Sequence, residues 1–186
     1  MKENRIYFKG NPWPDGHKIK NFSWITKIKD DEVWFHFTLE SEDYYAEFDH
    51  YDDPDYDEDQ DYESSWNAPG VWGNYHSCRI SSNFWHDGGF KVCNVKEYSA
   101  EYIDGLEITV DPDPESFEDF EDMAFHIYLL GHDAVGNHKI KFTRIGETDH
   151  FNIEWNGNIA LAYVGDYDFD YEFKTFITDV KIPELS

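Results

Sequence analysis

The sequence contains only two cysteines, Cys78 and Cys93, and it lacks the zinc-binding patterns Cys-x-x-Cys and His-Glu-x-x-His. Two thiols cannot supply a disulfide framework, so a reducing compartment is expected. A two-residue hairpin loop at Asp87-Gly88 would place Cys78 opposite Glu97 and Cys93 opposite Ser82, which argues against a bridge between the two thiols. We therefore expect both to be buried as small apolar side chains.

Long apolar runs are also absent. No segment approaches the roughly 18 consecutive apolar residues that a membrane span requires. The first residues, MKENRIYFKG, contain no apolar stretch of the kind found in secretory signal peptides. We therefore predict no membrane span and no leader, and a cytoplasmic location.

Positive charge is scarce. The chain has 15 Lys and Arg against 40 Asp and Glu, for a formal net charge of −25. The charge is uneven, because residues 1–29 carry a net +5 and the rest of the chain carries −30. Nucleic acids and anionic membranes are polyanions and would be repelled, so we predict neither as a partner. Neutral ligands, cations and basic proteins remain, although high charge also simply keeps a surface rich in aromatic residues soluble.

Catalytic and metal-binding motifs are missing as well. There is no Gly-x-Ser-x-Gly elbow and no glycine-rich phosphate loop. The alternating acids from Asp55 to Asp61 fail the EF-hand pattern, which needs glycine at its sixth position. Forty acids supply so many carboxylate pairs that a glycosidase-type pair has no specificity. We predict no catalytic residue, no metal and no cofactor, and we favour a binding role over an enzymatic one.

Aromatic residues, by contrast, make up 19% of the chain, as 15 Phe, 13 Tyr and seven Trp. Large rings contribute strongly to the hydrophobic core, and Tyr and Trp also tolerate half-exposed positions at grooves and interfaces. We therefore expect some of these rings to face a ligand.

Short stretches with alternating apolar residues, separated by turn residues, predict about ten to twelve strands. They cover residues 1–9, 22–29, 33–40, 42–51, 75–83, 89–97, 101–110, 123–130, 139–145, 151–155, 158–164 and 166–173, with a final strand ending near residue 182. Hairpin turns are expected at Asp87-Gly88 and Asn156-Gly157, and one short helix within residues 111–122. The predicted fold is all-β, an antiparallel β-sandwich or jelly-roll in a single domain of residues 1–186.

The most acidic stretch, residues 49–63, has nine acids and three tyrosines among its fifteen residues and no Lys or Arg. Like charges at this density repel, so residues 49–65 are predicted to form an exposed acidic loop. We predict a binding module for a basic protein, such as an inhibitor or immunity-type protein, because acids speed encounter and rings supply buried contact. The expected partner-binding residues are Asp52, Asp53, Asp55, Asp57, Asp59 and Asp61, with Tyr51, Tyr56 and Tyr62.

Two alternatives stay open at this point. A carbohydrate-binding module would stack sugars on exposed rings, and the candidate ligand-facing residues are Trp66, Trp72, Tyr75, Trp85 and His86. The competing interpretation of Trp66 and Trp72 is that they plug one end of the fold. A hydrolase-type enzyme on the same scaffold would need His and carboxylate side chains that converge in a pocket.

Overall fold

The computed structural model describes residues 4–47, 62 and 64–186. The strands are β1 (Arg5–Phe8), β2 (His17–Lys29), β3 (Glu32–Ser41), β4 (Arg79–Ser81), β5 (Phe90–Asn94), β6 (Glu107–Val110), β7 (His126–Tyr128), β8 (His132–Arg144), β9 (His150–Ala160) and β10 (Tyr171–Lys181). Two short helices, α1 (Pro69–Gly73) and α2 (Ala100–Ile103), and the 3₁₀ turns η2 (Pro114–Ser116), η3 (Phe120–Asp122) and η4 (Ala162–Val164) connect them. No helix in these described ranges has the length and apolar character needed to cross a membrane.

Eight of the strands close into a barrel in the order β2-β1-β10-β9-β8-β7-β4-β3, and β3 pairs back onto β2. The long β2–β3 hairpin turns at Asp30 and Asp31, both of which have positive φ. All pairings are antiparallel, and the all-β prediction is confirmed, but the sandwich or jelly-roll prediction is wrong. Alternating apolar residues look the same in a sandwich and a barrel, because both bury one face of each strand.

The barrel interior is filled with aromatic side chains. Phe37 on β3 contacts Trp155 on β9, on the opposite wall, with ring centroids 5.6 Å apart. Phe35 likewise reaches Phe142 on β8 at 5.7 Å, and Trp24 packs on Phe35 at 4.9 Å. Opposite walls therefore touch through their rings, and the described interior is a packed core.

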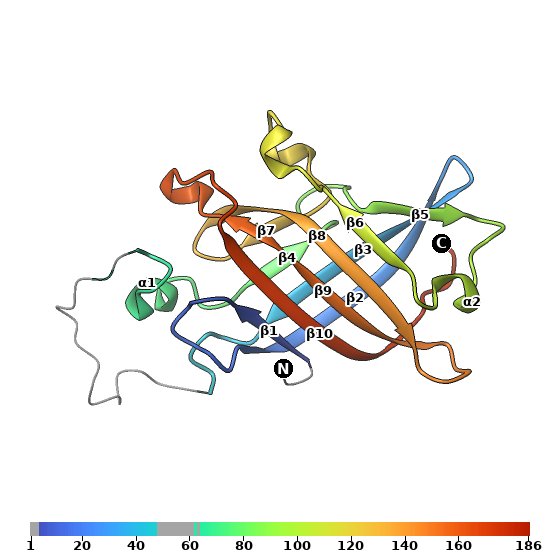
Figure 1. The fold of residues 1–186 in the computed structure, drawn as a ribbon, viewed down its shortest axis with the longest axis horizontal. Helices are drawn as coiled ribbons and strands as arrows, with labels where there is room; N and C mark the ends of the chain where they lie inside the picture. The colour runs from blue at the N-terminus through green and yellow to red at the C-terminus, as the bar shows by residue number, and fades with distance from the viewer. Residues whose placement is uncertain (1–3, 48–61, 63) are drawn as a thin grey trace.

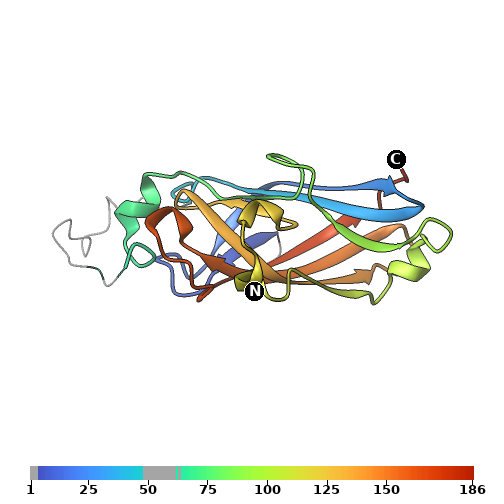
Figure 2. The ribbon, with the colours of Figure 1, turned by 90° about the horizontal axis from the view of Figure 1, so that it is seen from above.

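A second group of rings closes the end of the barrel near α1. Trp66 and Trp72 are 2% and 0% exposed, and they pack with Trp13 and Tyr44. The indole of Trp66 donates to the carbonyl of Lys9 at 2.9 Å, and that of Trp72 donates to the carbonyl of Trp66 at 2.8 Å. Figures 1 and 2 both show α1 and η4 at this end and α2 with the C-terminus at the other. The interpretation of Trp66 and Trp72 as a plug is confirmed.

The wall between β3 and β8 is built differently in its two halves. In one half, β4 pairs with both β3 and β7, and β7 pairs with β8, so the wall is continuous. In the other half, β5 pairs only with β3 and β6 pairs only with β8. Among the described strands, nothing joins β5 to β6.

Several predicted boundaries are wrong because tertiary pairing overrides local turn signals. The strand β9 runs straight through Asn156 and Gly157, since β8 and β10 pair with it on both sides. A Cβ on Gly157 would lie 2.7 Å from the Phe173 ring and 2.9 Å from His138, so this glycine allows close packing rather than a turn. Asp87-Gly88 does not form the predicted hairpin either, because β4 and β5 both pair with β3.

Other segments differ from the prediction in type. Residues 42–47 form a turn instead of a strand, and residues 48–51 lie outside the described residues. Residues 100–103 are helical, residues 166–170 precede β10 without strand pairing, and β8 begins at residue 132, seven residues before the predicted strand of residues 139–145. The expected helix within residues 111–122 is present only as η2 and η3.

Candidate functional site

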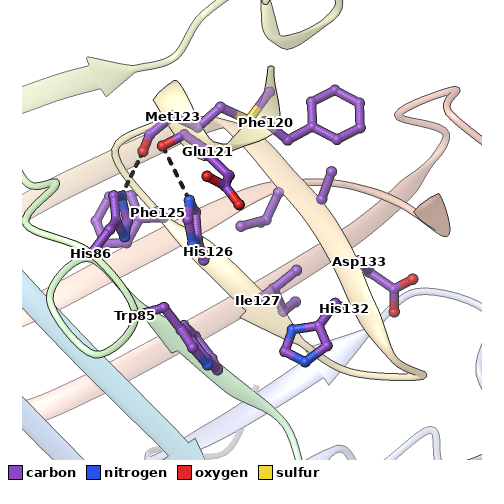
Figure 3. A pocket seen from close by; sticks show the side chains of 12 residues that line it. Trp85, His86, Phe120, Glu121, Met123, Phe125, His126, Ile127, His132 and Asp133 are labelled. Carbon is purple, nitrogen blue, oxygen red and sulfur yellow. Dashed lines mark hydrogen bonds between the residues drawn. The ribbon is translucent and has the colours of Figure 1, made fainter. Parts of the chain in front are cut away.

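A pocket of about 430 Å³ lies where η3 and β7 meet the loop before β5 (Figure 3). Its lining combines rings and apolar side chains with three histidines and two acids. These residues are Trp85, His86, Phe120, Glu121, Met123, Phe125, His126, Ile127, His132, Asp133, Ala134 and Val135. We call it the histidine pocket.

Two stacked histidines form one side of the pocket. The rings of His86 and His126 are nearly parallel, with centroids 3.7 Å apart. Nε2 of His86 donates to the carbonyl of Met123 at 2.9 Å, and Nε2 of His126 donates to the carbonyl of Glu121 at 3.4 Å. Burial first, and then the neighbouring His86, lower the pKa of His126. A neutral His126 can therefore stack closely on its neighbour at neutral pH.

The two acids of the pocket have different roles. The carboxylate of Asp133 accepts the backbone N–H groups of Leu130 at 2.9 Å and Tyr163 at 3.3 Å, so it holds two chain segments together. Burial raises its pKa. Glu121 is exposed, and its side chain has no ion pair with any residue that the structure describes. Figure 3 shows the Glu121 carboxylate on the same side of the pocket as His126, whereas the Asp133 carboxylate points away from the rings of the pocket.

A continuous row of rings leads out of the pocket across the surface. Its neighbouring centroids are 3.7 to 6.4 Å apart, in the order His86, His126, Trp85, His132, Tyr128, Tyr75 and Tyr163. We call this row the ring track. Trp85 is 37% exposed and Tyr163 is 62% exposed, so both present open ring surface. A smaller cavity of about 360 Å³ continues along it, lined by Trp85, Tyr128 and His132 among others.

Two acidic segments meet at the rim of the histidine pocket. Phe120 packs on Tyr167 at 6.1 Å and on Phe169 at 5.8 Å, which brings residues 111–122 against residues 166–170. These segments hold ten acids, and we call them the acidic border. Among the described residues, none of these ten acids forms an ion pair. Eight of the ten, all except Asp111 and Asp166, are exposed, so most of this charge is available to a partner.

The bases, in contrast, are mostly paired within the molecule. Of the Lys and Arg residues in the described ranges, those without an ion pair are Lys96, Lys139 and Lys174. Arg5 and Lys18 both bind Glu47, so the positive N-terminal segment is partly neutralised by its own chain. The uncompensated charge of the described surface is thus negative.

The structure places the sequence-predicted residues unequally. Tyr75, Trp85 and His86 lie together in the ring track, whereas the Trp66 and Trp72 rings are in the core and have almost no surface to offer a ligand. Tyr62 is half-buried. The remaining predicted partner-binding residues lie outside the described residues: Tyr51, Asp52, Asp53, Asp55, Tyr56, Asp57, Asp59 and Asp61.

Sequence reasoning missed His126, Tyr128 and His132 as members of a binding surface. Their spacing relates them only to one another, because residues 126 and 128 share one face of a strand and residue 132 follows across a tight turn, and it does not place them beside Trp85 and His86. In the described ranges, no group of three His, Cys, Asp or Glu side chains is arranged to hold a metal ion.

Comparison with protein-family models, curated proteins and solved structures gave no match. The histidine pocket contains no Ser, Thr or Cys in its lining, and both thiols are free and buried in the core. Burial raises the pKa of Cys78 and of Cys93, which makes both weak nucleophiles. The arrangement is suited to holding a cation or a flat ring.

Proposed function

We propose that this chain is a binding module for a basic protein, which docks where the acidic border meets the histidine pocket and the ring track. The observation that carries this proposal is the packing of Phe120 on Tyr167 and Phe169, which brings together two segments with eight exposed acids beside the exposed ring of Tyr167. Acids on a rim raise the rate of encounter with a positive partner, and desolvated rings supply most of the contact energy.

The rings also suit cations. The faces of Trp, Tyr and Phe attract ammonium and guanidinium groups by about 0.5–2 kcal/mol. The molecule already uses such contacts, since the Lys29 ammonium lies 4.9 Å from the Trp34 ring and the Arg79 guanidinium lies 4.1 Å from the Phe84 ring. A lysine or arginine side chain of the partner would meet Trp85 on one side and Glu121 on another.

The acidic stretch of residues 49–65 belongs to the same proposal as an additional source of attraction. The inhibitor or immunity type of function and the cytoplasmic location are also parts of it. The two free cysteines support a reducing compartment.

A fluorescent peptide of alternating Lys and Gly tests the proposal, because it is basic and has little tendency to form a strand. Its affinity is measured by polarisation for the wild type, for Trp85→Ala and for the double variant Glu121→Gln/Asp122→Asn. We expect Trp85→Ala to weaken binding about 2- to 30-fold, which is the range of a cation–π contact. Binding should also weaken between low salt and 0.3 M salt, because ions screen the attraction.

The matched control is Glu147→Gln/Glu154→Gln, which removes the same amount of charge from exposed positions elsewhere. This control should bind like the wild type apart from a small general effect of net charge. Equal losses in the control and in the Glu121/Asp122 variant, with no effect of Trp85→Ala, would mean that the peptide responds only to overall charge, and the proposed docking surface would be wrong.

A second candidate is the carbohydrate-binding module, and the exposure of Trp85 and Tyr163 on the ring track favours it. Sugars are neutral, so their binding would persist in high salt and would be lost in Trp85→Ala, while Glu121→Gln/Asp122→Asn would have little effect. The same measurements with an oligosaccharide panel therefore separate the two candidates. The hydrolase-type alternative keeps the three histidines of the pocket as its only support.

A further inference from the structure

The incomplete half of the barrel wall offers a second contact surface. The edges of β5 and β6 that face each other have no strand partner among the described residues. A cavity of about 610 Å³ lies between them, and it is lined by Phe90 and Lys91 of β5 and by Ile108, Thr109 and Val110 of β6. We call this cavity the β5–β6 slot. Figure 1 shows β5 and β6 as two separate strands that lie between η3 and α2.

The position of Ala124 shows that a polypeptide chain fits at the end of the slot near Gly89 and Asp111. Gly89, which precedes β5, donates its N–H to the carbonyl of Ala124 at 3.1 Å. The N–H of Ala124 in turn donates to the carboxylate of Asp111, which follows β6, at 2.9 Å. Ala124 therefore sits between the two strand ends and is hydrogen-bonded on both sides. Beyond Ala124, from Phe90 to Asn94, no described segment pairs with the free edge of β5.

The lining of the slot fits an extended segment with apolar and basic side chains. Trp34 and Ile108 supply apolar surface, and the indole Nε1 of Trp34 is buried without a hydrogen-bond partner among the described residues. The two lysines in the lining are already paired, Lys29 with Asp87 and Lys91 with Glu32. The acids left without an ion pair in the described lining are Asp111, Glu121 and Asp122, so the remaining charge is negative.

We propose that the β5–β6 slot receives an extended segment of the basic partner, which adds to the free edge of β5 as an extra strand in line with Ala124. Main-chain hydrogen bonds supply affinity in this mode of recognition, and alternate side chains supply specificity. Basic side chains of the segment meet Glu121 and Asp122. Because the slot shares His86, Glu121 and Met123 with the histidine pocket, one partner spans both surfaces. The charge of the occupant rests on the proposed function, whereas the strand addition does not.

Hydrogen exchange tests the proposal with a strand-length peptide of alternating Lys and Val. Saturating peptide should slow exchange of amides within residues 90–94 by about tenfold or more, because it pairs the free edge. Residues 79–81 are the internal control, since β4 is already paired on both edges and should not change. A peptide of the same sequence with alternate N-methylated amides should lose this protection, because it lacks half of its donors.

The outcomes separate this proposal from the proposed function. If the Lys–Gly peptide binds as expected but the Lys–Val peptide gives no protection in residues 90–94, the strand addition is wrong and the acidic docking surface stands. If a Thr–Val peptide protects these residues as strongly as the Lys–Val peptide, the strand addition stands and the basic character of the segment is wrong. Protection that rises with protein concentration, without peptide, would assign the slot to a second copy of this chain and overturn the partner assignment.

Discussion

The stability of the protein should fall with acid in a way that depends on one buried histidine. His138 is fully buried, and its Nδ1 accepts the indole N–H of Trp155 at 3.2 Å. Burial lowers its pKa to about 3. The unfolded chain has a histidine pKa near about 6.5, so below that pH the unfolded state gains a proton that the folded state does not accept.

The sign and size of the effect follow from this difference. A depressed pKa gives stability that is complete above the unfolded pKa and is lost as the pH falls from about 6.5 toward about 3. Each pH unit in this window costs about 1.4 kcal/mol for one proton, so His138 accounts for about 2 kcal/mol between pH 7 and pH 5. His17, whose pKa burial lowers to about 4, adds a loss of the same sign.

The assay is urea unfolding followed by tryptophan fluorescence at pH 7, 6 and 5 for the wild type and His138→Gln. Glutamine keeps an acceptor for Trp155 and removes the titrating group, so the variant should lose about 2 kcal/mol less than the wild type on acidification. The contribution of His17 is present in both proteins and cancels in the difference. His132→Gln, at an exposed position, should follow the wild type. Equal losses in the wild type and His138→Gln would refute the assigned burial of the neutral ring.

Two further predictions concern packing and thiol chemistry. Gly157→Ala should lower the free energy of unfolding by about 1–3 kcal/mol in the same urea assay, because its Cβ would meet the Phe173 ring and His138 at less than 3.0 Å. A change within about 0.5 kcal/mol would show that the β9 register differs from the one described. Cys78 and Cys93 should both resist an aromatic disulfide reagent in the native protein and react in urea, since burial raises the pKa of each thiol. Rapid native labelling of either thiol would contradict this.

Local patterns predicted much of the strand content but not its closure. The alternation of Val33, Phe35, Phe37 and Leu39 indicates which face of β3 is buried, and all four are 0% exposed. The barrel depends on pairings between residues that are far apart in the sequence, such as Arg5 with Phe176. No local sequence pattern indicates which distant strands will pair. For the same reason Asn156-Gly157 was misinterpreted, because two neighbouring strands hold it in an extended conformation.

The site was predictable in part. Tyr75, Trp85 and His86 were recognised as a group because large rings with polar partners lay close together in the sequence. His126 and His132 join them only through the pairing of β4 with β7, which no spacing in the sequence reveals. Trp66 and Trp72 lie in the same aromatic-rich stretch, but their indole N–H groups are satisfied by carbonyls inside the plug.

The contact of Phe37 with Trp155 across the lumen has a consequence for the size of any ligand. A hollow barrel admits only molecules that pass its mouth, but here the described interior is occupied by the protein's own rings. A ligand must therefore bind to the outer wall of the barrel and its loops, where no pore diameter limits the size of the ligand. A whole macromolecule can be accommodated there as readily as a metabolite, and the loops can diverge in sequence without disturbing the centre.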